Sequence, residues 1–149
     1  GPSFQDFVID KPEHSPHYEY HLHDPEDRKS HRRSIYRFIV RSQPQPFLTA
    51  LDCADPSMQV GKRNESVSPL QALTLLNNAL MLCLAKQFAA KLEGVAGGLP
   101  AKVRRAYFEA LGRPPSAADL SALLAYAQEF GLPNLCRVLF NLSEFSFVD

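Results

Sequence analysis

The distribution of prolines divides this chain of 149 residues into two parts of different character. Six prolines lie between Pro12 and Pro56, too close together for a long helix, because proline lacks the backbone N–H and clashes with the preceding turn. From Ser68 onward, apolar residues recur with the helical period. The sequence therefore predicts an irregular wrapping segment over residues 1–65 and a helical bundle over 66–149, together forming one domain.

A capping box marks the start of the first helix, with Ser68 at the N-cap, Pro69 at the first helical position and Gln71 at the third. Apolar residues continue from there to Leu92, and residues 79–85 are apolar throughout. This pattern predicts one long, central, buried helix. Its expected core-facing residues are Leu73, Leu76, Leu80, Leu84, Phe88 and Leu92.

Three further helices are predicted over residues 100–111, 116–131 and 133–141, with glycines and prolines at their ends. Ser116 caps the middle one, and short connections favour antiparallel neighbours. The fold class is therefore mainly α, an antiparallel C-terminal bundle. The apolar faces expected are Val103, Tyr107, Phe108 and Leu111, then Leu120, Leu123, Leu124 and Ala127, then Leu135, Val138, Leu139 and Leu142.

Two N-terminal stretches have their own periodicity. Residues 18–23 alternate apolar and polar side chains, which predicts a half-exposed strand and one short hairpin. Residues 34–40 fit either a strand or a helix, and the helix is slightly favoured because Ile35, Phe38 and Ile39 fall on one helical face.

Charges balance overall but not locally. Sixteen basic and sixteen acidic side chains cancel, so the overall charge indicates neither a nucleic-acid nor a membrane-surface partner. Residues 1–27 nevertheless hold seven acids and one base, whereas residues 28–41 hold six bases and no acid. The simplest interpretation is that the two runs pair with each other.

The three cysteines show no CxxC or CxxCH spacing, so neither a structural zinc site nor covalently attached haem is indicated. Cys83 and Cys136 lie in apolar helical runs and are expected to be buried. Cys53 stands between two acids that disfavour a thiolate, so it is not expected to be a nucleophile. With no GxSxG, HExxH, P-loop or GxGxxG motif, no catalytic residue is assigned, and no apolar stretch reaches the roughly 18 residues of a membrane span.

Histidines are dense near residue 20. On a strand, His21 and His23 would project from one side, and two neutral imidazoles are a workable start for a divalent metal site, to which His17 or Asp24 could add a third ligand. The alternative is a polar strand face that binds nothing.

Arg33, Arg37 and Arg41 recur at every fourth residue, which aligns them on a helix and also on one strand face. Such a row could hold a phosphate, a sulfate or a carboxylate. The alternative is that the row pairs with the acidic run upstream.

Several short motifs occur in a fixed order along nearly the whole chain. They include His31-Arg32-Arg33-Ser34, Leu51-Asp52-Cys53-Ala54-Asp55-Pro56, Lys62-Arg63-Asn64, Pro69-Leu70-Gln71-Ala72-Leu73, Leu75-Leu76-Asn77-Asn78, Leu111-Gly112-Arg113-Pro114-Pro115 and Ser143-Glu144-Phe145. In this order they resemble the planctomycete-type domain of unknown function 1553.

The resemblance implies that the chain is the C-terminal part of a larger exported protein, located in the periplasm or outside the cell. A cytochrome c domain that binds haem would lie elsewhere in that protein, and the resemblance supplies no catalytic residues. The leading hypothesis is a non-catalytic interaction or scaffolding module that contacts other domains of the parent protein or a polysaccharide. The alternative is a metal-dependent or redox enzyme fragment with its site at His17, His21 and His23.

The metal hypothesis makes a direct prediction. Protein purified without a histidine tag should contain divalent metal, or bind added zinc, if the three histidines form a site. Elemental analysis and zinc titration measure this. A preparation free of metal and without affinity for zinc would exclude the site.

Overall fold

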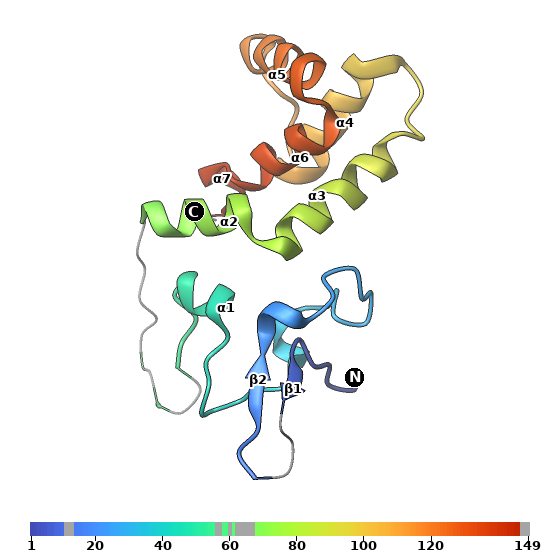
Figure 1. Ribbon diagram of the computed structural model, residues 1–149. Coiled ribbons are helices and arrows are strands. Elements are labelled where there is room, and N and C mark those ends of the chain that lie inside the picture. The colour runs from blue at the N-terminus through green and yellow to red at the C-terminus, as the bar shows by residue number, and fades with distance from the viewer. Residues whose placement is uncertain (11–13, 56–57, 60, 62–67, 147–149) are drawn as a thin grey trace. The chain divides into compact units, whose positions relative to one another are not determined.

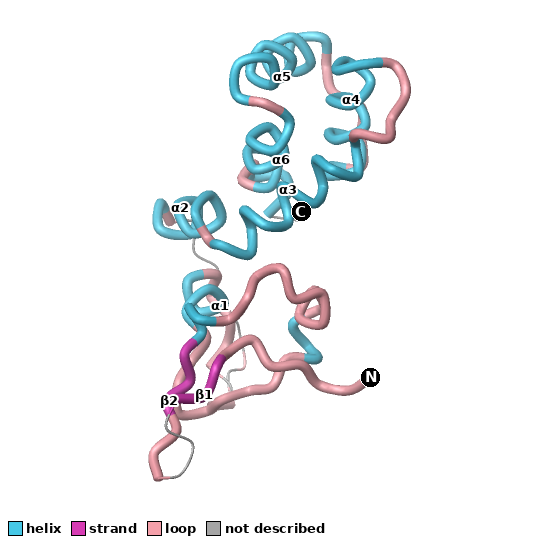
Figure 2. Tube along the Cα trace, turned by 45° about the vertical axis from the view of Figure 1, so that its right-hand side comes forward, coloured by secondary structure: helices cyan, strands magenta, loops and turns pink. Residues whose placement is uncertain are grey.

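The computed structural model describes residues 1–10, 14–55, 58–59, 61 and 68–146. It divides into two compact units, Gly1–Thr74 and Leu75–Asp149, which we describe separately. The N-terminal unit is mainly loop with one short hairpin, and the C-terminal unit is mainly helix (Figures 1 and 2). The mainly α fold class with one short hairpin is thereby confirmed. The Lys62-Arg63-Asn64 motif lies outside the described residues.

The hairpin consists of β1 (Val8–Asp10) and β2 (His17–Glu19), paired antiparallel with Ile9 opposite Tyr18. The strand predicted over residues 18–23 is therefore wrong at its C-terminal end, because Tyr20–Leu22 form a 3-10 helix. The hydroxyl of Tyr20 donates a hydrogen bond to Gln43 O (2.8 Å), and its ring packs against Phe7. These tertiary contacts accompany the turn that ends the strand.

Phe7 is the centre of the small core of this unit. It is 6% exposed, and three aromatic rings lie edge-on to it, with centroids 5.0 Å away for Tyr18, 5.8 Å for Tyr20 and 6.0 Å for Phe38. Val40 is equally buried. A few aromatic contacts thus hold together a unit with little regular secondary structure, since each ring buries a large apolar area.

The side chain of Gln43 takes the place of a third strand. Its amide nitrogen donates to Tyr18 O (2.8 Å), and its amide oxygen accepts from Tyr18 N (3.2 Å). One glutamine thereby satisfies both backbone groups on the outer edge of β2, where an unpaired strand would expose them. The loop that carries Gln43 is fixed to the hairpin as a result.

The rest of the N-terminal unit contains α1 (Pro46–Ala50) and the first residues of α2 (Pro69–Asn77). The predicted capping box of α2 is confirmed, because Gln71 N donates to Ser68 Oγ and Ser68 N donates to Gln71 Oε1, both at 3.3 Å. The Gln71 amide nitrogen also donates to Asp52 Oδ2 (2.9 Å), which joins α2 to the turn after α1.

The single long helix predicted from Pro69 to Leu92 is wrong, because the structure has two helices there. α3 (Ala79–Leu92) follows α2 at an angle of 55°. Between them, Asn78 has extended backbone angles (φ −65°, ψ 136°), and its side chain accepts a hydrogen bond from Leu80 N (2.9 Å). Asparagine is a preferred N-cap residue, so Asn78 starts a new helix within an apolar run that conceals the break.

Among the described residues, no single helix is long and apolar enough to cross a membrane, although α2 and α3 together pass the same test as a bent pair.

Four more helices complete the described part of the C-terminal unit: α4 (Gly98–Leu111), α5 (Ala117–Phe130), α6 (Leu132–Phe140) and the short α7 (Ser143–Ser146). The capping box of Ser116 with Asp119 is present at the start of α5. The most deeply buried residues come from α3, α4 and α6, and α3 contacts α6. Side chains with 0–1% exposure are Leu92, Val103, Ala106, Leu135, Cys136 and Leu139.

The buried face of α3 differs from the predicted one by a single position. Met81, Ala85, Ala89 and Leu92 are buried, whereas the predicted Leu80, Leu84 and Phe88 are only half-buried beside them. Alanines at two positions of the buried stripe let the partner helices come close, and the larger side chains then fill the flanks.

On α4, the predicted core residue Phe108 is 50% exposed. The buried faces predicted around Val103 on α4, Ala127 on α5 and Leu135 on α6 are confirmed.

A core substitution tests this packing. Leu139→Ala should lower the free energy of unfolding of the C-terminal unit by about 2–5 kcal/mol, because it removes a fully buried side chain and leaves a cavity. Leu70→Ala, at a leucine that is 62% exposed, should change it by no more than about 0.5 kcal/mol. Urea unfolding followed by circular dichroism measures both, and equal losses would contradict the assignment of the core.

Candidate functional site

The residues with the greatest potential for binding lie in the basic segment, by which we mean residues 28–41. It begins with a turn, continues through a 3-10 helix (Ser34–Tyr36) and then runs extended. Two backbone hydrogen bonds attach it to the N-terminal residues, from Phe4 N to Tyr36 O (3.0 Å) and from Phe38 N to Phe4 O (2.8 Å). The helix favoured over residues 34–40 is thus limited to one short 3-10 turn.

Arg37 faces the interior of the N-terminal unit. Its guanidinium lies 3.6 Å from Asp6 Oδ1, and only 11% of the Arg37 side chain and 14% of the Asp6 side chain are exposed. Burial raises the pKa of Tyr20 above its ordinary value, and the cation of Arg37 partly offsets that effect. Arg37 therefore stabilises the fold around Phe7.

Arg32 is also used within the unit. It donates to Pro2 O (2.6 Å), and its guanidinium carbon lies 4.6 Å from the centre of the Tyr36 ring. The N-terminal residues are thereby fixed to the basic segment, and the ring of Tyr36 is covered on one side by a cation.

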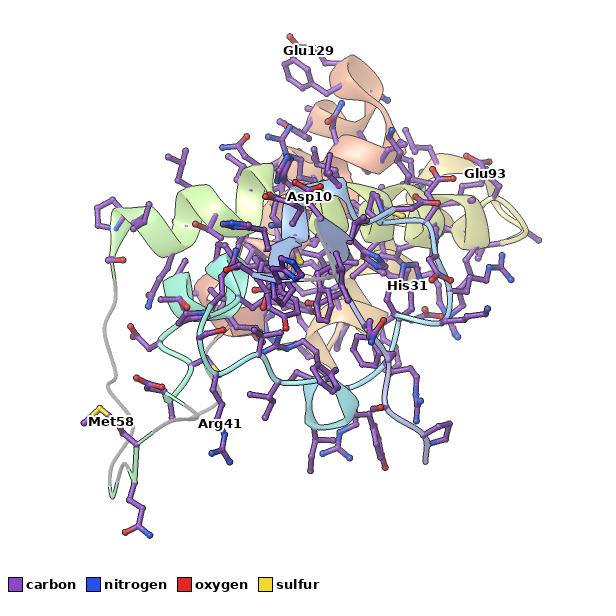
Figure 3. All side chains as sticks on the ribbon, turned by 60° about the horizontal axis from the view of Figure 1, so that its bottom comes forward. Asp10, His31, Arg41, Met58, Glu93 and Glu129 are labelled. Atoms are coloured by element: carbon purple, nitrogen blue, oxygen red, sulfur yellow. The ribbon has the colours of Figure 1, made fainter. Side chains whose placement is uncertain are left out.

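The other basic side chains of the segment have no acidic partner among the described residues. No carboxylate in the described part of the chain lies within ion-pair distance of Arg28, Lys29, Arg33 or Arg41, and all four are exposed. Arg41 projects from its loop into open space (Figure 3). Pairing between the acidic and basic runs is thus limited, among the residues described, to Asp6 with Arg37.

The predicted arginine row is broken by these differences. Arg33 precedes the 3-10 helix, Arg37 pairs with Asp6, and Arg41 follows the extended stretch. Because neither a continuous helix nor a continuous strand connects the three, the regular spacing in sequence does not become a row in space. Anion binding by these arginines stays a prediction, with Arg33 and Arg41 as its exposed members.

The histidines are similarly dispersed. His17 is exposed on β2, and His21 lies in the 3-10 helix with Nδ1 3.1 Å from Glu19 Oε2. His23 is half-buried, and its Nε2 has no hydrogen-bond partner among the described residues. The shared strand face on which the metal hypothesis depended is absent, and the described residues contain no group of three potential ligands. A metal site at these histidines stays a prediction without that geometric support.

The sequence analysis missed the exposed apolar side chains of the basic segment. Ile35 is 77% exposed and Ile39 is 51% exposed, and the helical face on which the sequence placed them is absent. Tyr36 and Phe38 are exposed to 37% and 44%. The sequence did contain a signal for this exposure. Large apolar residues surround Arg37 on both sides, and a short stretch of chain cannot bury all of them. Exposed apolar groups of this kind often mark binding surfaces.

Two of the three cysteines are buried. Burial raises the pKa of Cys136 to about 12, which keeps its thiol protonated. Cys83 is buried as predicted, and Cys53 is exposed beside Asp52.

Polar motif residues of the C-terminal unit join its helices. Gly112 ends α4 with left-handed backbone angles (φ 73°, ψ 2°), which a residue without a Cβ adopts easily. Directly after it, Arg113 donates from Nε and from its second terminal nitrogen to the two carboxylate oxygens of Glu144, at 2.6 and 2.7 Å. Arg113 also lies over the ring of Tyr107, 5.2 Å from its centre. Two motifs separated by about thirty residues thus meet in one bidentate pair.

The break between α2 and α3 is held by α6. Arg137 Nε donates to Leu76 O (2.5 Å), and another nitrogen of its guanidinium donates to Asn77 Oδ1 (2.9 Å). A cation at the C-terminal end of a helix also interacts favourably with the helix dipole.

The pair of Arg113 and Glu144 predicts a specific pH dependence. Hydrogen bonds from Arg113 hold the pKa of Glu144 below its ordinary value. The pair therefore stabilises the folded state fully above the unfolded glutamate pKa of about 4.3, and this contribution disappears as the pH falls through the lower folded pKa. Wild type should lose more stability than Glu144→Gln between about pH 5 and pH 3. Thermal unfolding across this range measures it, and parallel pH profiles would contradict the pairing.

Comparison with known proteins identifies one family. Residues 2–127 match the family described as PSD1, protein of unknown function (DUF1553). No match was found among curated proteins or among solved structures. Since the matched residues make up most of the chain, the protein belongs to the DUF1553 family.

Proposed function

We propose that the chain is a non-catalytic interaction and scaffolding module of a larger, exported, cytochrome c-associated protein. The observation that carries this proposal is the structural use of the polar residues in the family-like motifs. Several of those that the structure describes cap helices or join helices, and their side-chain groups are occupied in doing so.

Three examples support this. Asn78 caps α3 through its side chain. Gln71 closes the capping box of α2 and also reaches Asp52. Arg113 pairs with Glu144 between the end of α4 and α7. Recurrent polar residues in an enzyme would instead be expected to converge on a cleft.

The shifted pKa values support the same interpretation. A strongly shifted pKa in a cleft is a sign of catalytic function. In the described residues, burial raises the pKa of Tyr20, Tyr107 and Cys136, each within a packed core. Hydrogen bonds lower the pKa of Glu109 at a surface ion pair and of Asp119 at a helix cap. Each shift thus has a structural cause.

The finer parts of the proposal come from the family resemblance. They are export to the periplasm or the cell exterior, a haem-binding cytochrome c domain elsewhere in the parent protein, and contacts with other domains of that protein. Contact with a polysaccharide is supported by the exposure of Arg33 and Arg41, which have no ion-pair partner among the described residues.

A binding experiment tests the proposal. The chain is titrated by calorimetry against the remainder of its full-length parent protein, and in a parallel titration against dextran sulfate at low salt. Saturable binding to the parent remainder is expected, with a Kd on the order of micromolar or tighter. Absence of binding in both titrations would contradict the proposal, as would a catalytic activity of the reassembled protein that is lost on substitution of His17 or His21.

A further inference from the structure

We propose that the basic segment binds the surface of an anionic lipid bilayer. Ile35 and Ile39 would enter the headgroup region, and Arg28, Lys29, Arg33 and Arg41 would lie against lipid phosphates. This inference rests on the proposed function as an interaction module and names a partner for it. It concerns attachment to a surface and requires no membrane-spanning helix.

The apolar part of the surface is fixed by the fold. Phe38 contacts Phe7 while remaining 44% exposed, and Val40 is 6% exposed, so the chain is attached to the small core on both sides of Ile39. Ile39, between them, is 51% exposed. Ile35 lies in the middle of the 3-10 turn, and its exposure of 77% is the largest among the large hydrophobic residues described.

The backbone keeps these side chains in place. The backbone of Phe4 forms hydrogen bonds with the backbones of Tyr36 and Phe38. Arg37 N donates to Ser34 O (3.0 Å) and closes the 3-10 turn. Arg37 contacts Asp6 in the interior of the unit, and Arg32 donates a hydrogen bond to Pro2 O at its surface. These contacts fix the backbone around Ile35 and Ile39. Their exposure is therefore a fixed property of the folded unit.

The charged side chains of the segment itself, apart from its histidine, all have one sign. The four outward bases flank Ile35 and Ile39 in sequence, and residues 28–41 contain no acid. Asp27, just before the segment, accepts a hydrogen bond at Oδ1 from the backbone N–H of Lys29 (3.0 Å). Although the net charge of the chain is zero, charges are screened beyond roughly 10 Å in salt solution, so the local excess decides what binds here.

An anionic bilayer satisfies both features together. A sulfated polysaccharide offers charge but would leave Ile35 and Ile39 in water. A folded protein partner needs roughly 800 Å² of complementary surface on each side, more than a short projecting turn offers. The fluid headgroup region adapts to a projecting turn, takes up apolar side chains and attracts bases at its surface. Tyr36, beside Ile35, is a residue type enriched at this boundary.

Vesicle sedimentation with the full chain tests the inference. The probes are vesicles of phosphatidylcholine alone and vesicles with about 30% phosphatidylglycerol, at low and at physiological salt. Binding is expected only to the anionic vesicles and should weaken as salt rises. Arg33→Gln combined with Arg41→Gln should reduce the partition coefficient about tenfold or more, and Ile35→Ser should also reduce it several-fold.

Matched controls separate this surface from general charge and hydrophobicity. Lys86→Gln with Arg104→Gln removes two exposed bases of the C-terminal unit, and Leu70→Ser removes an exposed leucine of α2. Both should leave binding unchanged. Circular dichroism confirms that each variant is folded.

The outcomes are distinct. Loss of binding in the segment variants alone supports the inference. No binding to anionic vesicles, or equal effects in the controls, overturns it. If Ile35→Ser has no effect and dextran sulfate competes fully, the segment is a polyanion site and the lipid proposal fails. Calorimetric binding to the parent remainder without vesicle binding would refute this inference while leaving the proposed function intact.

Discussion

Leu135, Cys136 and Leu139 on one face of α6 are fully buried, and the organisation of the C-terminal unit depends on that contact. They belong to the same apolar cluster as Ala85 and Ala89 of α3. Small side chains on one helix and large ones on the other allow close packing without voids. From its adjoining face, α6 also reaches the end of α2 through Arg137, so the helix that forms the core also fixes the break between α2 and α3.

The N-terminal unit is stabilised by other means. It has a single short hairpin, and its remaining backbone groups are satisfied in part by side chains, as the amide of Gln43 does for Tyr18. The rings around Phe7 provide its core. A unit built in this way leaves a large share of its chain on the surface, which is where binding residues are usually found.

The helical packing of the C-terminal unit and the loop-rich structure of the N-terminal unit suit different roles. The polar motif residues of the C-terminal unit are engaged in capping and in joining helices, which suits a scaffold. The basic segment of the N-terminal unit combines exposed apolar and basic residues. Its backbone is hydrogen bonded to Phe4, and its Arg37 and Arg32 contact Asp6 and Pro2. The scaffolding and the surface contact that we propose thus lie in different parts of the chain.

The sequence by itself determined the helical class, the caps at Ser68 and Ser116, the burial of Cys83 and Cys136, and the buried faces of α5 and α6. Each of these depends on local periodicity or on hydrogen bonds between residues close in the chain. Only the tertiary structure decided that Asn78 divides an apolar run into two helices, that Tyr20 turns away from the strand, and that Arg37 points inward while Ile35 stays exposed. Those outcomes depend on partners far away in sequence, namely Arg137, Gln43, Asp6 and Phe4, and local patterns carry no information about which distant group will be near.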